Sequence, residues 1–345
     1  MNAQSEEILN FQTTKPMTLC GVVRKSFSIA KTSPKTFFLI ILTLILPLSF
    51  AILAHSEFST PLLDVIPTTA YDEILYKHHS WLQFFIFIVG YPMFLFIFSL
   101  LSTAAVVFTA ASLYTRRPVS FVSTLRAIPR VFKRLFITFL FISLLMLLYI
   151  AVSCVFLVTI IGILDVGAHP YVFCTLILSL LIVFLMIHIY ITAIWHLASV
   201  VSVLEPVYGL AAMKKSKKLL TGKKSMGITL VFAYLTMCVG IEIAYSLCNL
   251  YHRKLIRYSL RALLVGVLVI VNFVGLLVQS VFYFVCKSYH GEEIDKSVLY
   301  ESLGGYVGEY VRLRSSTEMK NAESEMDVKE MKKVESEMDA VEGKV

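Results

Sequence analysis

Polar and ionisable side chains within long apolar runs are the residues of this chain that could support chemistry. Glu242 is the only acidic residue inside such a run, and a charge is costly in lipid, which makes it a functional candidate. Four polar residues of neighbouring runs complete the candidate intramembrane site with Glu242: His188, Asn272, His196 and Gln279. At 1.5 Å per residue, His188, Glu242 and Asn272 fall at a similar depth, roughly 21–25 Å from one membrane surface. This layer could hold a proton, a cation or a polar headgroup; alternatively, its members form interhelical hydrogen bonds that stabilise the bundle.

Metal binding and catalysis have little support in the sequence. His188 and His196 lie about 12 Å apart along a helix, too far to share an ion whose bonds are near 2 Å. The chain contains no HExxH, GxSxG or P-loop motif, which are common signatures of membrane hydrolases and pumps. We therefore expect a protein without catalytic residues, metal or cofactor.

Six apolar runs must position these polar residues. The 345 residues are 57% hydrophobic and 16% charged, which argues against a soluble or disordered protein and is typical of a multi-pass membrane protein. A helix needs about 20 apolar residues to cross a bilayer. Pro47 and Pro92 predict a kink in the first run and a break in the second. The six runs predict an all-α integral membrane fold with six transmembrane helices: 37–54, 81–113, 135–164, 170–204, 226–250 and 262–286.

The charge of +8 is distributed unevenly between the runs. Segments 1–36, 114–134 and 205–225 are basic, whereas 55–80 is acidic. This alternation predicts that both termini are cytoplasmic, because cytoplasmic loops carry an excess of Lys and Arg. The connection 251–261 contains four basic residues although it is predicted to lie outside, so it is the exception to the pattern.

The composition also predicts three parts of the chain. Residues 1–36 form a cytoplasmic segment with a basic amphipathic helix, and residues 37–286 form the six-span domain. Residues 287–345 form a mixed-charge cytoplasmic tail that we expect to be largely disordered and that could bind a protein partner.

A basic amphipathic segment precedes each odd-numbered run, at 18–36, 119–134 and 206–224. The pattern suggests three repeated units, each an interfacial helix followed by a membrane hairpin. In such helices the apolar face enters the headgroup region, while each basic residue gains about 1 kcal/mol from anionic lipid. Alternatively the charges only fix the topology, and nucleic-acid binding is not expected because no aromatic platform accompanies them. The candidate headgroup contacts are Arg126, Arg130, Lys133, Arg134, Lys214, Lys215, Lys217, Lys218, Lys223 and Lys224.

Apolar stripes at helical spacing predict which faces of the three segments are buried. In the first segment the stripe is Val22, Val23, Phe27 and Ala30. In the second segment, Phe121, Leu125, Ile128 and Phe132 mark one face. In the third segment a weaker stripe is Leu210, Met213 and Leu220. We expect these side chains to face the apolar side of each helix.

A structural loop motif follows the fourth run and is marked by Glu205, Ser216 and Gly222. Pro206 can occupy the first turn of the next helix, and the Glu205 carboxylate would complement that helix dipole. Alternatively, Glu205 pairs with Lys214 or Lys215 to set the position of the loop. Gly222 is placed to end the short helix.

This motif resembles one in the membrane domain of glycerophosphodiester phosphodiesterases. It consists of Val203-Leu204-Glu205, then Gly209 to Ser216, then Leu219 to Lys223. An uncharacterised plant family of six-span proteins is more similar, because it shares a Gly-Glu-Tyr-Val stretch, here Gly308–Val311. The resemblance implies a six-helix membrane domain with cytoplasmic termini, and it carries over no catalytic residue.

Two functions follow from these patterns. The first is a non-enzymatic protein of an endomembrane or the plasma membrane that organises lipids or partner proteins through its basic cytoplasmic face. The second is a transporter or lipid-handling protein that uses the layer at Glu242, His188 and Asn272. The sequence leaves the oligomeric state and any ligand open.

Overall fold

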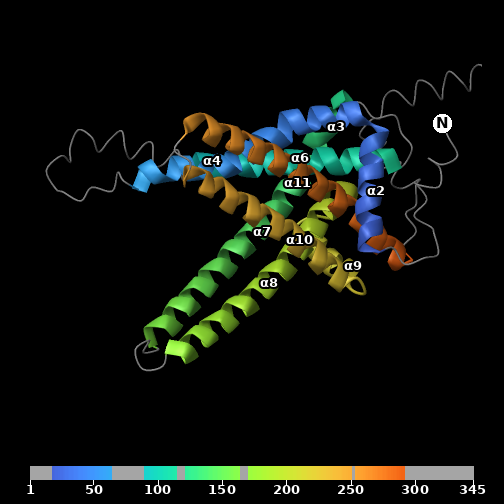
Figure 1. Ribbon diagram of the computed structural model, residues 1–345. Helices are drawn as coiled ribbons and strands as arrows, with labels where there is room; N and C mark the ends of the chain where they lie inside the picture. Colours follow the sequence, from blue (N-terminus) through green and yellow to red (C-terminus); the bar gives the residue numbers. More distant parts are fainter. Residues whose placement is uncertain (1–17, 64–88, 115–120, 164–169, 251–252, 292–345) are drawn as a thin grey trace, which may run out of the picture. The chain divides into compact units, whose positions relative to one another are not determined.

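The computed structural model describes residues 18–63, 89–114, 121–163, 170–250 and 253–291 (Figure 1). The predictions for the N-terminal segment before residue 18, for much of the second loop and for the tail beyond residue 291 therefore lie outside the described residues.

Every element of the described ranges is helical, and six stretches are long and apolar enough to cross a membrane. The prediction of an all-α fold with six such helices is confirmed. The elements are α2 (Leu19–Thr32), α3 (Pro34–Ile40), the π-helical η1 (Ile41–Ile45), α4 (Leu46–Leu63), α6 (Tyr91–Tyr114), α7 (Phe121–Ile163), α8 (Pro170–Leu204), α9 (Leu210–Leu220), α10 (Lys224–Leu247), the short 3₁₀ helix η3 (Cys248–Leu250) and α11 (Lys254–Tyr289).

A π-helical turn precedes the proline in each of the first two spans. Pro47 follows the π-helical turn of η1, in which the Leu46 amide donates to the Ile41 carbonyl five residues earlier. This wider turn accommodates the proline, which has no amide hydrogen to donate and whose ring crowds the preceding turn. In the second span, residues 89–90 are π-helical and lead directly into α6, which begins at Tyr91. The described backbone therefore stays helical through Pro92, and the predicted break is not seen there; residues 81–88 lie outside the described ranges.

The basic lead-in segments are not alike in structure. Ser33 and Pro34 separate α2 from α3, and a turn at Gly222 separates α9 from α10. The second lead-in instead continues without interruption into its span, so that α7 is a single helix of 43 residues with Pro129 inside it. The repeated unit is therefore irregular at its second copy.

Most of the basic connection 251–261 is also helical, because α11 begins at Lys254 and extends the sixth span by about two turns. We had expected a loop there. The segment has no glycine or proline to stop a helix, so the helix begins soon after η3 rather than at the first apolar run.

α11 is the helix around which the others assemble, since it contacts α2, α4, α6, α8, α9 and α10. Its C-terminal half is buried from Leu277 to Cys286 with one exception, and Tyr114 at the end of α6 stacks on Phe284 at 4.7 Å between ring centroids. The facing part of α6, Ser102–Tyr114, is entirely buried and rich in Ser, Thr and Ala. Small side chains allow helix backbones to approach closely in apolar surroundings.

The α7–α8 hairpin differs from this core. Figure 1 shows the two helices side by side, extending away from α4, α6 and α11. Toward the connection between them, large apolar side chains such as Val158 are mostly exposed. Such a surface suits contact with lipid tails rather than with water.

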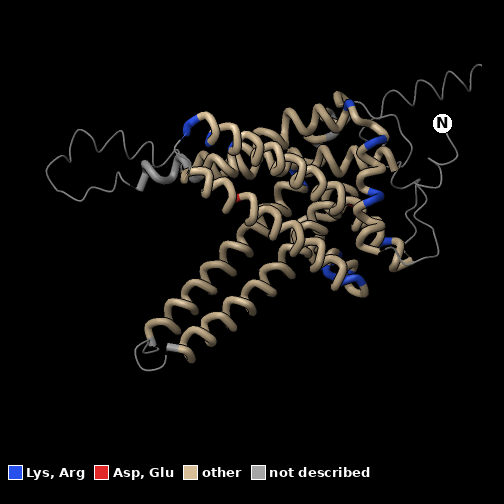
Figure 2. The backbone as a smooth tube through the Cα atoms, viewed as in Figure 1, with Lys and Arg blue, Asp and Glu red and all other residues tan. Residues whose placement is uncertain are grey.

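The basic residues gather at the ends of the bundle. Figure 2 shows Lys and Arg on α2, on α9 and at both ends of α11. Hydrogen bonds place several ends together: Thr109 of α6 meets Thr124 of α7 at 3.3 Å, and His290 after α11 meets the Leu219 carbonyl of α9 at 3.1 Å. The basic segments at 18–36, 121–134 and 206–224 therefore share the end of the bundle at which α11 finishes.

Candidate functional site

Polar side chains meet at three levels along α11. The surface tier consists of Glu205, Lys215, Tyr283 and Lys287. The middle tier consists of His196, Ser199, Gln279, Tyr234, Asn272 and Ser49. The far tier consists of Arg261, Asn249 and Tyr245. On α11 the tiers are represented by Tyr283, by Gln279 and Asn272, and by Arg261. At 1.5 Å per residue, the middle tier begins about 6 Å from Tyr283 and ends about 16 Å from Arg261.

The surface tier joins three helices through one carboxylate. Glu205, directly after α8, is 9% exposed. Its Oε2 lies 2.6 Å from Lys215 Nζ of α9. Its Oε1 accepts a hydrogen bond of 2.6 Å from the Tyr283 hydroxyl and one of 3.2 Å from Lys287 Nζ, both on α11. The carboxylate thus fixes the ends of α8, α9 and α11 to one another.

The charge on Glu205 is stable in this position. Burial by itself raises the pKa of the carboxyl, but the hydrogen bonds from Lys215 and Tyr283 and the charges of Lys287 and Lys215 together lower the pKa below its usual value of 4.5. Glu205 is therefore ionised at neutral pH, and its pairing with Lys215 is one of the two alternatives that the sequence left open.

The loop from α8 to α9 is held by a second, uncharged contact. Thr138 of α7 is fully buried, and its Oγ1 lies 2.8 Å from Ser202 Oγ and accepts a 2.8 Å bond from the Gly209 amide. Gly209 adopts φ 62°, a conformation that favours glycine, and forms the N-cap of α9. The expectation that Pro206 opens this helix is wrong, because the chain first makes a bend and the helix begins at Leu210.

Small residues determine which face of α9 is buried. Ala212 and Ser216 are completely buried, with the Ser216 hydroxyl bonded to the Ala212 carbonyl. Leu210, which we expected in the buried stripe, is 58% exposed. The stripe was wrong there because α9 packs against protein through its Ala-x-x-x-Ser face, whose small side chains permit a close approach.

Gly222 ends α9 as predicted and has a further reason to be glycine. Its φ is 93°, and a Cβ at this position would lie 2.3 Å from the Tyr289 ring. The turn therefore requires both a left-handed backbone and the absence of a side chain. Tyr289 also contacts Lys223, whose Nζ is 4.9 Å from the ring centroid.

The buried face of α2 differs from the predicted stripe as well. Val22, Lys25, Ser26 and Ile29 are buried, whereas Phe27 is 49% exposed. Burial lowers the pKa of Lys25 to about 8. The pattern of apolar residues failed here because a lysine with its long apolar stem can occupy a packed face.

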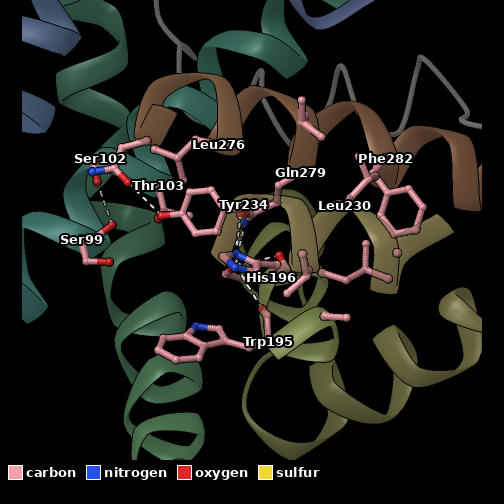
Figure 3. A pocket seen from close by; sticks show the side chains of 18 of the residues that line it. Ser99, Ser102, Thr103, Trp195, His196, Leu230, Tyr234, Leu276, Gln279 and Phe282 are labelled. Atoms are coloured by element: carbon pink, nitrogen blue, oxygen red, sulfur yellow. Dashed lines mark hydrogen bonds between the residues drawn. The ribbon is translucent and has the colours of Figure 1, made fainter. Parts of the chain in front are cut away.

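The middle tier is a chain of uncharged hydrogen bonds. His196 Nδ1 lies 2.9 Å from Gln279 Oε1, and Gln279 Nε2 donates to Ser199 Oγ at 2.9 Å. Nearby, Asn272 accepts from the Tyr234 hydroxyl at 2.8 Å and donates to Ser49 Oγ at 2.9 Å. These two short networks connect α4, α8, α10 and α11. Figure 3 shows the His196 ring between Trp195 and Tyr234.

The network determines which ring nitrogen of His196 carries a hydrogen. The Ser199 hydroxyl donates to the His196 carbonyl at 2.8 Å, so its oxygen accepts from the Gln279 amide group. Gln279 Oε1 is then an acceptor and requires a hydrogen on Nδ1 of His196. In the neutral ring, Nε2 is consequently an acceptor, and no described residue lies within hydrogen-bond distance of it.

A cavity of about 150 Å³ adjoins this tier. Polar wall residues include His196, Gln279 and Asn272, together with Ser99 and Thr103 of α6 (Figure 3). At 1.5 Å per residue, His196 is about 14 Å from Glu205, close to the middle of a hydrocarbon core about 30 Å thick. The site can therefore hold a small molecule at mid-membrane depth.

The structure brings together only part of the predicted intramembrane set. His196, Gln279 and Asn272 line the cavity. His188 instead stacks on Tyr149 within the α7–α8 hairpin, with ring centroids 6.2 Å apart. Glu242 is an exposed residue of α10 and is not among the cavity's lining residues.

The far tier explains how a basic connection can lie at the opposite end of the bundle. Arg261 is 7% exposed, donates to Asn249 Oδ1 and lies over the Tyr245 ring at 5.0 Å. Arg261, one of the four basic residues of the connection 251–261, is therefore buried within the protein. A buried arginine contributes less than an exposed one to the charge bias that sets membrane orientation.

The candidate headgroup residues differ in exposure. Lys133, Lys214, Lys217, Lys218 and Lys224 are exposed. Arg134, Lys215 and Lys223 are half-buried. The side chains of Arg126 and Arg130 lie outside what the structure describes.

Several residues of these tiers were missed by sequence reasoning. Thr138, Ser199, Tyr234 and Tyr283 are common polar residues of apolar helices, and nothing in their spacing distinguishes them. Lys287 was counted only as part of the tail. Within the described ranges, no group of three or more His, Cys, Asp or Glu residues is placed to hold a metal ion.

Comparison with known proteins gives one result at the level of the family. A search of curated proteins found no match to the chain, and a search of solved structures found none either. A family model described as Domain of unknown function (DUF8558) matches residues 1–322. Because this match covers nearly all of the 345 residues, the chain belongs to the family described as Domain of unknown function (DUF8558).

Proposed function

We propose that this protein crosses an endomembrane or the plasma membrane six times, with both termini in the cytoplasm. Its basic end, formed by α2, α9 and the first turns of α7, contacts anionic headgroups of the cytoplasmic leaflet. Through this surface it organises lipids or partner proteins without catalysing a reaction. The resemblance of the 203–223 motif to the membrane domain of glycerophosphodiester phosphodiesterases supports a shared arrangement of helices rather than a shared activity.

One observation carries the proposal: α9 separates its lysines from its buried face. Lys214, Lys217 and Lys218 are exposed, whereas Ala212 and Ser216 are completely buried. The rigid attachment of α9 through Glu205 holds the exposed lysines at one level of the bundle. A fixed row of ammonium groups at the membrane surface attracts anionic lipid at about 1 kcal/mol per residue, and salt weakens this attraction.

The experiment compares lipid binding by the full chain and a triple variant. The protein in detergent micelles is titrated with short-chain phosphatidylserine and, separately, with short-chain phosphatidylcholine. We expect the wild type to prefer phosphatidylserine and to lose this preference as salt rises. Lys214→Gln, Lys217→Gln and Lys218→Gln together should weaken phosphatidylserine binding at least tenfold, because the three charges are worth about 1 kcal/mol each.

The matched control removes basic charge from the other end of the bundle, by Arg253→Gln and Lys254→Gln at the start of α11. These residues are also exposed, and the proposed topology places them outside. Equal binding by the wild type and the α9 variant, or equal losses in the two variants, would contradict the proposal.

The cavity favours a second role, the binding or translocation of a ligand within the membrane. Of the layer proposed at Glu242, His188 and Asn272, Asn272 lines the cavity. The cavity also contains His196 and Gln279, so we propose His196 rather than His188 as the histidine of this role.

A further inference from the structure

We propose that the middle-tier cavity binds a small, uncharged, mainly apolar molecule that carries one hydroxyl group, with the hydroxyl donating to His196 Nε2. Small alicyclic alcohols are members of this class. The inference rests on the second proposed role and names the chemistry of its ligand.

The size of the ligand follows from the cavity volume of about 150 Å³. An engineered apolar cavity of about this volume binds benzene, so a six-membered ring with one substituent is near the upper limit. A whole phospholipid is too large for it.

The charge of the ligand follows from the residues around it. None of the described lining residues is Asp, Glu, Lys or Arg. An ion would therefore lose its hydration without gaining an opposite charge, at a large cost in free energy. The ligand must be neutral.

A hydroxyl group on the ligand is suited to two polar groups that the networks leave over. Nδ1 of His196 and both ends of the Gln279 amide are occupied, which leaves Nε2 as an acceptor without a protein partner in the described ranges. Thr103 is 4% exposed and lines the cavity, and its hydroxyl has no hydrogen-bond partner among the described residues. A ligand hydroxyl can donate to Nε2, and Thr103 offers a second hydrogen-bonding group in the wall of the same cavity.

The apolar body of the ligand follows from the rest of the wall. Phe139, Trp195, Leu230, Leu276 and Phe282 all line the cavity. These side chains pack against a hydrocarbon ring without requiring a polar partner. Molecules of this class also dissolve in a bilayer, which is the phase around the middle of the spans.

The test uses Trp195 as the reporter, because it lines the cavity and the chain contains only two tryptophans. Trp81→Phe leaves Trp195 as the only one. The full-length Trp81→Phe protein in detergent is titrated with cyclohexanol and with methylcyclohexane, which has nearly the same shape but no hydroxyl. We expect a saturable change in emission and about three- to tenfold tighter binding of cyclohexanol, the range of one net hydrogen bond.

Variants identify the atoms responsible. His196→Leu should abolish the preference for cyclohexanol. Thr103→Val, which keeps the volume, should reduce the preference and shows the effect even if His196→Leu fails to fold. His188→Leu is the matched control on the same helix, and it should bind both probes as the parent does.

Some outcomes would overturn the inference. These are emission changes that never saturate, equal affinities for the two probes, or a preference that survives both His196→Leu and Thr103→Val. If only the preference for phosphatidylserine fails, the surface role falls and this inference stands. If cyclohexanol binds but does not cross vesicles containing the protein faster than empty ones, translocation falls and binding stands.

Discussion

The surface tier and the middle tier use the same helices, α8 and α11, for opposite purposes. In the surface tier, three donors surround one ionised carboxylate that is largely buried. In the middle tier, uncharged groups bond to one another in pairs and leave Nε2 of His196 beside a cavity. The first arrangement fixes the ends of helices, and the second leaves space and an acceptor for another molecule. Polar residues in membrane spans therefore cannot be assigned a role by their type alone.

Removal of the surface-tier carboxylate should have the largest effect. Glu205→Gln keeps the shape but leaves Lys215 and Lys287 near a neutral amide in a largely buried position. We expect a loss of about 3 kcal/mol in the free energy of unfolding, at the lower end for broken buried pairs because both lysines retain some exposure. Denaturation by SDS of the detergent-solubilised protein measures it.

The control is Glu242→Gln, which removes the acidic residue of α10 instead. Glu242 is exposed on a spanning helix, so its neutralisation should not lower the unfolding midpoint. Equal effects of the two substitutions would show that the Glu205 contacts do not fix the ends of α8, α9 and α11.

Removal of the uncharged contact next to this tier should cost less. Thr138→Val keeps the volume but leaves the Ser202 hydroxyl and the Gly209 amide short of a buried partner. We expect a loss of about 2 kcal/mol from the unpaired groups, together with faster proteolysis of the loop before α9. Thr43→Val is the control, since the Thr43 hydroxyl is exposed and bonds only within its own helix; a similar loss there would refute the role of Thr138.

The middle tier should be weaker still. Asn272→Leu removes the bonds to Tyr234 and to Ser49, and bonds of this kind between membrane helices average about 0.6 kcal/mol. A loss of about 1 kcal/mol in the same unfolding assay is expected. A loss as large as that of Glu205→Gln would mean that the middle tier is as tightly built as the surface tier, which would remove the distinction between them.

The smallest effect on the unfolding midpoint is expected from changes of pH near neutrality. The pKa of Glu205 is lowered in the folded protein from 4.5, so the unfolded state binds more protons in acid. The stabilisation is complete above about pH 4.5 and is lost as pH falls through the folded pKa. The unfolding midpoint of the wild type should therefore approach that of Glu205→Gln below pH 4.5 and keep a constant distance from it between pH 6 and 8. If the difference between the two midpoints changes between pH 6 and 8, a group other than Glu205 is titrating.

The sequence predicted the helices well and their contacts poorly. The fourth run was predicted at 170–204, and α8 is Pro170–Leu204. Gly222 ended its helix as expected, because glycine permits a left-handed backbone wherever it occurs. The stripe on α2 and the helix start at Pro206 were wrong, because both depended on what the segment packs against.

The candidate site shows the same division. Its members come from positions far apart: Glu205 and Tyr283 are separated by 78 residues, His196 and Gln279 by 83, and Asn272 and Ser49 by 223. Depth along each helix could be calculated from the sequence, but depth alone placed His188 and Glu242 in one layer with Asn272. The direction in which each helix presents a residue was missing from that calculation.

The sequence by itself determined that the chain forms six long apolar helices with basic segments beside them, because apolar length and local backbone preferences act within a segment. Only the tertiary structure decided that Glu205 joins the ends of three helices and that His196 lines a cavity. A helix fixes which residues share a face through its 3.6-residue period. Which side chains that face meets depends on the neighbouring helices, and no local pattern contains that information.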